Sequence, residues 1–188
     1  MWLDRWGATD TEVASAMPGD HLVAAPGSVA TRSITLGCGP DEVFDWLAQM
    51  GTGRAGWYSY DLIDNFGRRS ARHIEPSWQV GEAGEPIPAG PMAFDTPVVD
   101  RPHALVIAVR QRRLLGHVVD FVLAYRLDPA AEASPSSAAS EDAASTRLVT
   151  RATIAIRGPL GRLATVALTV GDGVMVRRQL IGLRERCG

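Results

Sequence analysis

Two long segments in the second half of the chain alternate apolar and polar side chains, and this alternation limits the possible folds more than any other feature. In residues 118–127 the apolar side chains stand at the odd positions and Asp120 and Arg126 stand between them. In residues 146–157 the apolar positions oppose Arg147, Arg151 and Arg157. Successive side chains of a strand point to opposite faces, so both segments predict antiparallel strands with one buried face and one face in water.

Further elements follow from shorter patterns. Residues 30–36, 94–99 and 104–111 are rich in β-branched and apolar residues between turn signals, which predicts three more strands. Pro40 followed by two acids opens a predicted helix that runs to Met50, since its apolar residues recur at the helical period. A short helix is expected at about residues 59–66, and residues 67–90 are expected to hold at most short strands.

The end of the chain predicts helices over residues 160–170 and 174–186. Val176, Leu180 and Leu183 would share one apolar face, and Gly171-Asp172-Gly173 would break or kink the helix between the two parts. Several antiparallel strands before a long terminal helix predict an α+β fold, in which a curved sheet wraps around that helix.

The 188 residues predict a single domain with two accessory segments. Residues 1–28 form an expected N-terminal arm, in which Thr9 and Glu12 fit a capping box. Trp2 and Trp6 would fold this arm back onto the body. Residues 129–145 are an Ala/Ser/Pro tract that cannot bury enough apolar area to order itself, so a floppy loop is expected there.

The most unusual segment lies between Gly51 and Asn65. Three of the twelve aromatic residues fall within four positions there, behind three glycines. Aromatic side chains with polar tips, beside residues that permit unusual backbone angles, favour the wall of a small-molecule pocket. The candidate ligand-binding residues are Arg54, Trp57, Tyr58, Tyr60, Asp61 and, from the apolar face of the strand at 118–127, Phe121.

Each polar candidate has a structural and a functional interpretation. Arg54 would form a salt bridge with Asp61 that fixes the loop, or would bind a ligand carboxylate. Tyr58 and Tyr60 would be core residues, or would donate hydrogen bonds or protons to a ligand. An enzyme hypothesis requires at least two of these four polar tips to meet at a common point in a cavity.

Several function classes are excluded or disfavoured. All 19 basic residues are arginine, and without lysine neither Schiff-base catalysis nor a lysine-dependent phosphate loop is possible. The glycines at 51, 53 and 56 follow a helix rather than a strand, so they do not predict dinucleotide binding. The net charge of −2 favours neither nucleic acid nor an anionic membrane as partner. The charge is uneven, however, because residues 101–188 hold 13 of the arginines and only 7 of the acids.

The remaining expectations concern metals and location. Cys38 and Cys187 are far apart in the sequence and have no neighbouring ligands, which predicts reduced cysteines, no metal site and no cofactor. No apolar run is long enough to cross a bilayer, and a charge interrupts the first residues before any signal peptide forms. The expected location is therefore cytoplasmic, without stable membrane insertion.

The arginines at 110, 112 and 113 and those in the last helix leave contact with a membrane surface or nucleic acid as an alternative. The sequence does not indicate the oligomeric state.

Five blocks of the sequence resemble the START-like superfamily, also called SRPBCC or helix-grip proteins. Within it the sequence is most similar to a bacterial group of uncharacterised proteins often labelled polyketide cyclase/dehydrase-like. The blocks span almost the whole chain and comprise Trp6–Asp10, Pro18–Asp20, Thr31–Ile34, Gln49–Asp61 and Thr146–Val149.

The resemblance implies a helix-grip fold with a deep, mostly apolar cavity between a bent sheet and the C-terminal helix. Members bind lipids, polyketides, quinones or other hydrophobic molecules, and some cyclise or dehydrate them. The tract after Pro129 is longer than the family's usual tight turn, and the sequence contains no established catalytic set of the aromatase/cyclases. The expected function is therefore that of a carrier or sensor of a hydrophobic small molecule, with a cyclase or dehydratase as the alternative. A third hypothesis is an interaction module whose arm docks on another chain.

Overall fold

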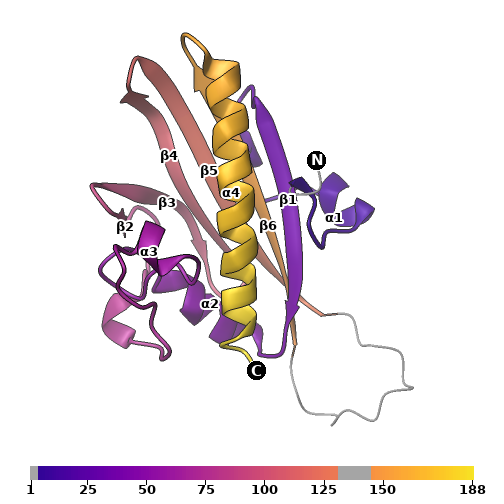
Figure 1. Cartoon of the computed structure of the whole chain (residues 1–188). Coiled ribbons are helices and arrows are strands. Elements are labelled where there is room, and N and C mark those ends of the chain that lie inside the picture. The colour runs from indigo at the N-terminus through magenta and orange to yellow at the C-terminus, as the bar shows by residue number, and fades with distance from the viewer. Residues whose placement is uncertain (1–3, 131–144) are drawn as a thin grey trace.

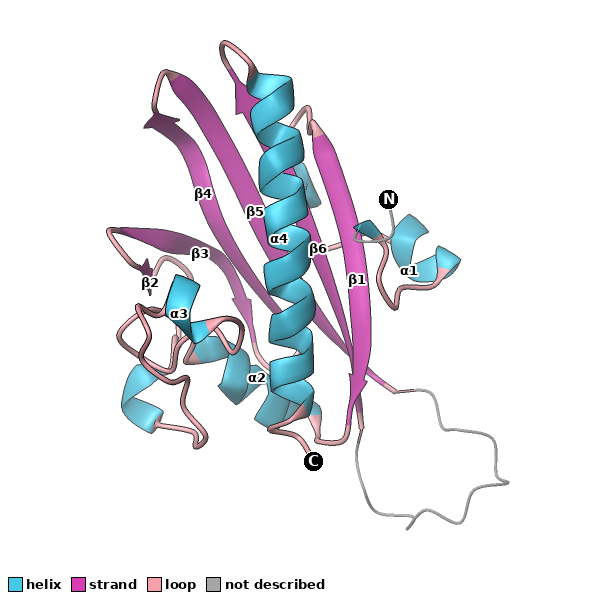
Figure 2. Ribbon diagram, viewed as in Figure 1, coloured by secondary structure: helices cyan, strands magenta, loops and turns pink. Residues whose placement is uncertain are grey.

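The computed structural model describes residues 4–130 and 145–188, and in them a six-stranded antiparallel sheet carries a long helix on one face (Figures 1 and 2). The strand order is β1-β6-β5-β4-β3-β2. The strands are β1 (Ser28–Leu36), β2 (Ile87–Ala89), β3 (Met92–Asp100), β4 (Ala104–Leu114), β5 (His117–Pro129) and β6 (Thr146–Arg157). The helices are α1 (Asp10–Ala14), α2 (Pro40–Ala48), α3 (Asp61–Asp64) and α4 (Gly161–Arg184), with short 3-10 turns at Asp20–Leu22 and Pro76–Trp78. The α+β class and the helix-grip arrangement expected from the sequence are confirmed.

The strands predicted from alternation form the centre of the sheet. β5 pairs with β6 in one continuous antiparallel register, from Val118 opposite Arg157 to Pro129 opposite Thr146. The register shifts in the pairing of β3 with β4 and of β4 with β5, and such irregularities bend a strand and increase its twist. The bent strands leave room beneath α4 that a flat sheet would not. Residues 131–144, most of the tract expected to be a floppy loop, lie outside the described residues.

The helix α4 is one continuous element. It contacts β1 and β6 and runs through Gly171 and Gly173 without a break, so the glycines do not interrupt it. Val176, Leu180 and Leu183 are buried together, as the periodicity predicted. In the described ranges, no helix combines the length and the hydropathy needed to cross a membrane.

The N-terminal segment covers the sheet face opposite α4. Met17 and Val23 pack there on Val106, Val122 and Val149. The capping box of α1 is formed as predicted, with the Thr9 hydroxyl and the Glu12 carboxylate each accepting the other residue's backbone N–H. Trp6 packs on the edge of the main core, whereas Trp2 lies outside the described residues.

Arginines of the central strands hold this segment in place. Arg151 donates to Asp20 and to the backbone carbonyls of Glu12 and Val13, and Arg147 pairs with Glu12 at 2.7 Å. The hydrogen bonds from Arg147 lower the pKa of Glu12 to about 2. The expectation that this face lies in water is therefore wrong at Arg151, which is buried, because a segment distant in the sequence covers it.

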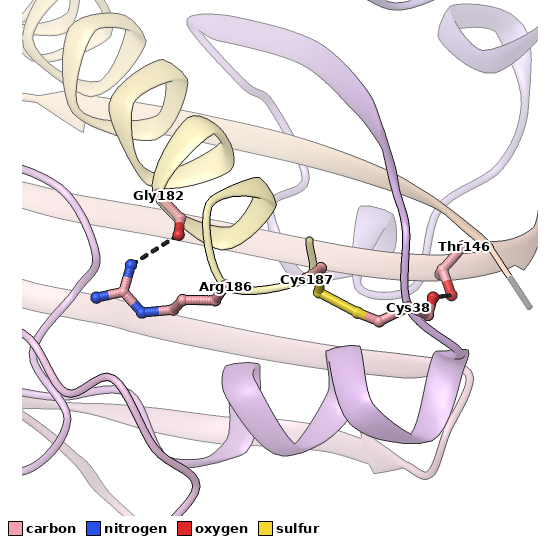
Figure 3. The surroundings of a disulfide bond; sticks show 5 residues. All are labelled: Cys38, Thr146, Gly182, Arg186 and Cys187. Carbon is pink, nitrogen blue, oxygen red and sulfur yellow. Dashed lines mark hydrogen bonds between the residues drawn. A yellow bond between two sulfur atoms is a disulfide. The ribbon is translucent and has the colours of Figure 1, made fainter. Parts of the chain in front are cut away.

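The two cysteines form a disulfide bond, which corrects the prediction of reduced thiols (Figure 3). Cys38 follows β1 and Cys187 follows α4, so the bond ties the C-terminal end of α4 to the start of α2 across a separation of 149 residues. Thr146 donates to the carbonyl of Cys38 and anchors the same corner to β6. Disulfides persist in oxidising compartments, so this bond removes the cysteine argument for a cytoplasmic location.

Candidate functional site

A cavity of about 610 Å³ lies between α4, the inner face of β3–β5 and the segment 52–66. Its walls are mainly apolar and come from all three elements. They include Trp57, Phe94, Ile107, Phe121, Leu123 and Met175. Ile63, Phe66 and Leu168 also line the cavity and are exposed, so the cavity reaches the surface between α3 and α4. A hollow of this size and lining is typical of sites that hold small hydrophobic ligands.

Three aromatic rings form one wall. Trp57 meets Phe94 of β3 edge-to-face at 5.6 Å between ring centroids, and Phe94 lies 5.9 Å from Phe121 of β5. The Trp57 indole N–H donates to the Thr52 hydroxyl at 3.2 Å, which fixes the ring against the cavity. Two of the six candidates from the sequence, Trp57 and Phe121, therefore come together here, joined by Phe94, which the sequence did not single out.

Close packing against α4 positions the aromatic segment. A Cβ atom at Gly182 would lie 2.1 Å from the backbone oxygen of Tyr58, so only glycine lets the segment approach the helix here. Gly56 has a φ of 76° and a Cβ there would lie 2.5 Å from the Ser70 hydroxyl, so the tight turn also requires glycine. The Ser59 hydroxyl donates to the carbonyl of Met175 at 3.0 Å. The segment and α4 thus build the two sides of the cavity as one unit.

Tyr58 points away from the cavity into the core. Its hydroxyl donates to the carbonyl of Trp46 at 2.8 Å and accepts from the side chain of Gln49 at 3.0 Å. Burial raises the pKa of the Tyr58 hydroxyl, and the guanidinium of Arg186 lies 4.4 Å from its ring centroid. The residue has a φ of 58°, and this left-handed backbone turns its side chain to the opposite side from Trp57.

The other three polar candidates do not line the cavity either. Arg54 donates to the carbonyl of Ala48, and Asp61 accepts from the backbone and hydroxyl of Ser70, so the predicted Arg54–Asp61 salt bridge is not formed. Tyr60 precedes α3 and is largely exposed. None of the four polar side chains therefore lines the cavity, although the enzyme hypothesis required at least two of them to meet there.

Two polar groups of the cavity wall lie on α4. Asp172 is buried and pairs with the buried Arg32 of β1 at 2.9 Å. Burial raises the pKa of Asp172, and the guanidinium opposes that rise. Gln179, about two helical turns further on, accepts from the Tyr125 hydroxyl at 2.8 Å. The sequence singled out Asp172 only as part of a helix break, although an acid inside a long apolar stretch was a usable signal.

Asp64 is the second acid of the wall. Both its carboxylate oxygens are buried, and within the described part of the chain only the Ser59 hydroxyl and nearby backbone N–H groups act on them, too poorly placed for full hydrogen bonds. Burial, with a smaller effect of the neighbouring Asp61, raises the pKa of Asp64 to about 6. The sequence favoured Asp61 as a partner of Arg54 and did not single out Asp64, which lies on the same short helix.

A smaller, polar pocket of about 210 Å³ adjoins the cavity at Ser59. Tyr58 and Asp61 line this second pocket beside arginines from the 69–72 loop and the end of α4. Arg178 pairs with Glu185 at 2.8 Å, and Arg186 donates to the carbonyls of Ala71 and Gly182. The bond to Ala71 joins the end of α4 to the loop.

Three groups near the disulfide have the atom types of metal ligands. The ligand atoms of Cys38, Glu42 and Cys187 lie within 4.8 Å of one another. Both sulfur atoms are bonded to each other, so thiolate ligation there requires prior reduction.

A scan against protein-family models found no match, and a search of the curated proteins found none either. The basis for comparing this chain with others is therefore its architecture, a six-stranded antiparallel sheet with a long C-terminal helix packed against it.

Proposed function

We propose that the protein binds a hydrophobic small molecule in the cavity beneath α4 and acts as its carrier or sensor. The observation that carries this proposal is the cavity of about 610 Å³ with its wall of three aromatic rings. Apolar contact would supply most of the affinity, and the acids Asp64 and Asp172 would select ligands that can donate a hydrogen bond.

The helix-grip architecture and the sequence blocks together support membership of the START-like superfamily. The cavity has the place that the resemblance implies, between the bent sheet and the C-terminal helix. Lipids and polyketides are the ligand classes that this membership suggests. We favour a carrier over an enzyme that uses the 54–61 loop, because Arg54, Tyr58 and Asp61 form hydrogen bonds with other groups of the protein.

Filling the cavity tests the proposal. A Cβ atom at Gly171 meets nothing within 4 Å and the residue lines the cavity, so Gly171→Trp is chosen to direct an indole into the hollow from a position with room for the side chain to start. We expect the affinity for the neutral probe N-phenyl-naphthylamine, measured by fluorescence titration, to fall by about tenfold or more, because the interior has little other free volume. Val174→Trp is the matched control, since Val174 lies on the same helix but does not line the cavity.

Native mass spectrometry of gently purified protein supplies the independent readout. We expect a co-purified small molecule that organic extraction releases and that Gly171→Trp no longer retains. Equal probe affinity in Gly171→Trp and Val174→Trp, or an empty protein that binds no probe, contradicts the proposal.

A further inference from the structure

The first half of α4 has its polar and apolar faces reversed. Thr165, Thr169 and Asp172, spaced three and four residues apart, are buried against the sheet. Leu163, Val166, Val170 and Val174 recur at the same spacing on the exposed side, and Leu163 is 66% exposed. A helix that covers only a sheet turns its apolar stripe inward, so this reversal indicates that a second apolar partner belongs on the outer face.

The exposed apolar surface continues beyond α4. Leu62, Ile63 and Phe66, in and next to α3, are exposed across the cavity opening. Leu114 ends β4, Leu115 lies in the β4–β5 turn and is 91% exposed, and Leu160 ends the β6–α4 turn. Figure 1 shows these two turns at the same end of the molecule, where α4 begins. We call the exposed apolar residues of α3, of the first half of α4 and of the two turns the apolar rim.

Positive charge accompanies the apolar rim. Arg110, Arg112 and Arg113 lie next to the β4–β5 turn and Arg162 lies in the first turn of α4, and all four are exposed. Among the described residues none of the four makes an ion pair. Residues 104–119 contain no acid, and neither do residues 158–171. The rim therefore carries a local positive charge although the whole chain has a net charge of −2.

We propose that the apolar rim docks on the surface of an anionic lipid bilayer. Leucine and valine side chains would enter the interface while the arginines meet lipid phosphates and carboxylates, which is the combination that peripheral membrane surfaces use. A second copy of the chain fits less well, because a symmetric contact would place the same arginines on both sides of the interface. The cavity reaches the surface inside this rim, so docking would let a hydrophobic ligand pass between bilayer and cavity without crossing water.

Vesicle co-sedimentation of the full chain tests the docking surface. We expect binding to vesicles of phosphatidylcholine with phosphatidylserine and much weaker binding to phosphatidylcholine alone. The variant Leu163→Asp/Val170→Asp is expected to lower the partition coefficient by about tenfold or more, since it places two charges in the apolar contact. The control Val13→Asp/Val29→Asp adds the same charge at two exposed apolar positions outside the rim and is expected to bind as the native chain does.

A second variant tests the arginines. Arg112→Glu/Arg113→Glu is expected to reduce binding to the anionic vesicles by about tenfold or more, and about 1 M salt is expected to reduce native binding similarly, because the Debye length is then roughly 3 Å. All substituted side chains are exposed, and circular dichroism checks that each variant is folded.

Any one of three results overturns the proposal. The first is that the native chain does not bind anionic vesicles, and the second is that the rim variant and its control lose the same amount of vesicle binding. The third is that light scattering shows a native dimer that Leu163→Asp/Val170→Asp dissociates. The last result would assign the rim to self-association. Vesicle binding needs no cavity ligand, so Gly171→Trp is expected to bind vesicles normally, and failure of either proposal leaves the other standing.

Discussion

The two halves of α4 bury opposite kinds of side chain within one continuous helix. The second half buries Val176, Leu180 and Leu183 against the sheet and is fixed at its end by the disulfide of Cys187. The first half buries threonines whose hydroxyls donate to carbonyls of the preceding helical turn, Thr165 to Gly161 and Thr169 to Thr165. The second half is therefore held by apolar packing and the first half by buried polar groups, and the cavity lies beneath the middle of the helix, from Ala167 to Gln179. Amphipathicity averaged over the whole helix conceals this difference.

The largest effect is expected at the boundary between the halves. Asp172→Ala leaves the buried guanidinium of Arg32 without the carboxylate at its Nη1 atom, and breaking a buried ion pair costs about 3–5 kcal/mol. Urea unfolding measures this loss. The double variant Arg32→Met/Asp172→Leu is expected to recover most of it, since apolar residues of similar volume replace the pair. A double variant as unstable as Asp172→Ala would show that the site requires charge.

The next prediction compares the halves directly with one substitution. Leu180→Ala removes a side chain that is 0% exposed and is expected to lower the free energy of unfolding by about 2–5 kcal/mol. Leu163→Ala makes the same change on the exposed side of the first half and is expected to alter it by less than about 0.5 kcal/mol. Equal losses at the two positions would mean that the first half is also held by packing.

The disulfide gives the third effect. Cys187→Ser opens the link between the end of α4 and the start of α2, and the loss of a bond that closes so long a loop is expected to cost about 2–4 kcal/mol. Adding a reductant to the native chain should give the same shift in urea unfolding, and no further shift in Cys187→Ser. Binding of the cavity probe by folded Cys187→Ser is expected to be unchanged, because the bond lies at the end of α4 away from the cavity lining. A loss of probe affinity equal to that of Gly171→Trp would contradict this separation.

The contrast between the halves also shows what the sequence could predict. Alternation located β5 and β6, and the helical period located the face of Leu180, because burial in those regions follows the local pattern. The period did not reveal the reversed first half, since a mixed Thr and Val stretch is ambiguous until the sheet is in place. The pairing of Cys38 with Cys187 depends on contacts between distant segments, so residue spacing gave no access to it.

The candidate site shows the same limit. The clustering of aromatic residues correctly drew attention to the 51–65 segment, and Trp57 lines the cavity. The opposite direction of Tyr58 follows from its left-handed backbone and from the contact with Gly182, and neither is encoded in the local composition. Asp64 became visible as a wall residue only once the fold had buried it, whereas Asp172 could have been noticed as an acid inside a long apolar stretch.

The smallest predicted effect is a pH dependence of stability that arises from Asp64 in the cavity wall. The pKa of Asp64 is raised from its ordinary value of 3.8 to about 6, so between these values the folded chain binds a proton that the unfolded chain has lost. Its contribution to stability is therefore complete below about pH 4 and is lost as the pH rises through 6. Asp64→Asn is expected to remove this decline in stability, as measured by urea unfolding between pH 4 and 6.

Glu12 shows the opposite pH dependence. Its pKa is lowered to about 2, so its contribution to stability is lost as the pH falls from its ordinary pKa of 4.5 towards 2. Glu12→Gln should therefore flatten the acid limb and lower the stability above about pH 4.5, where the native carboxylate contributes in full. An unchanged slope between pH 4 and 6 in Asp64→Asn would show that water or a ligand already compensates the carboxylate.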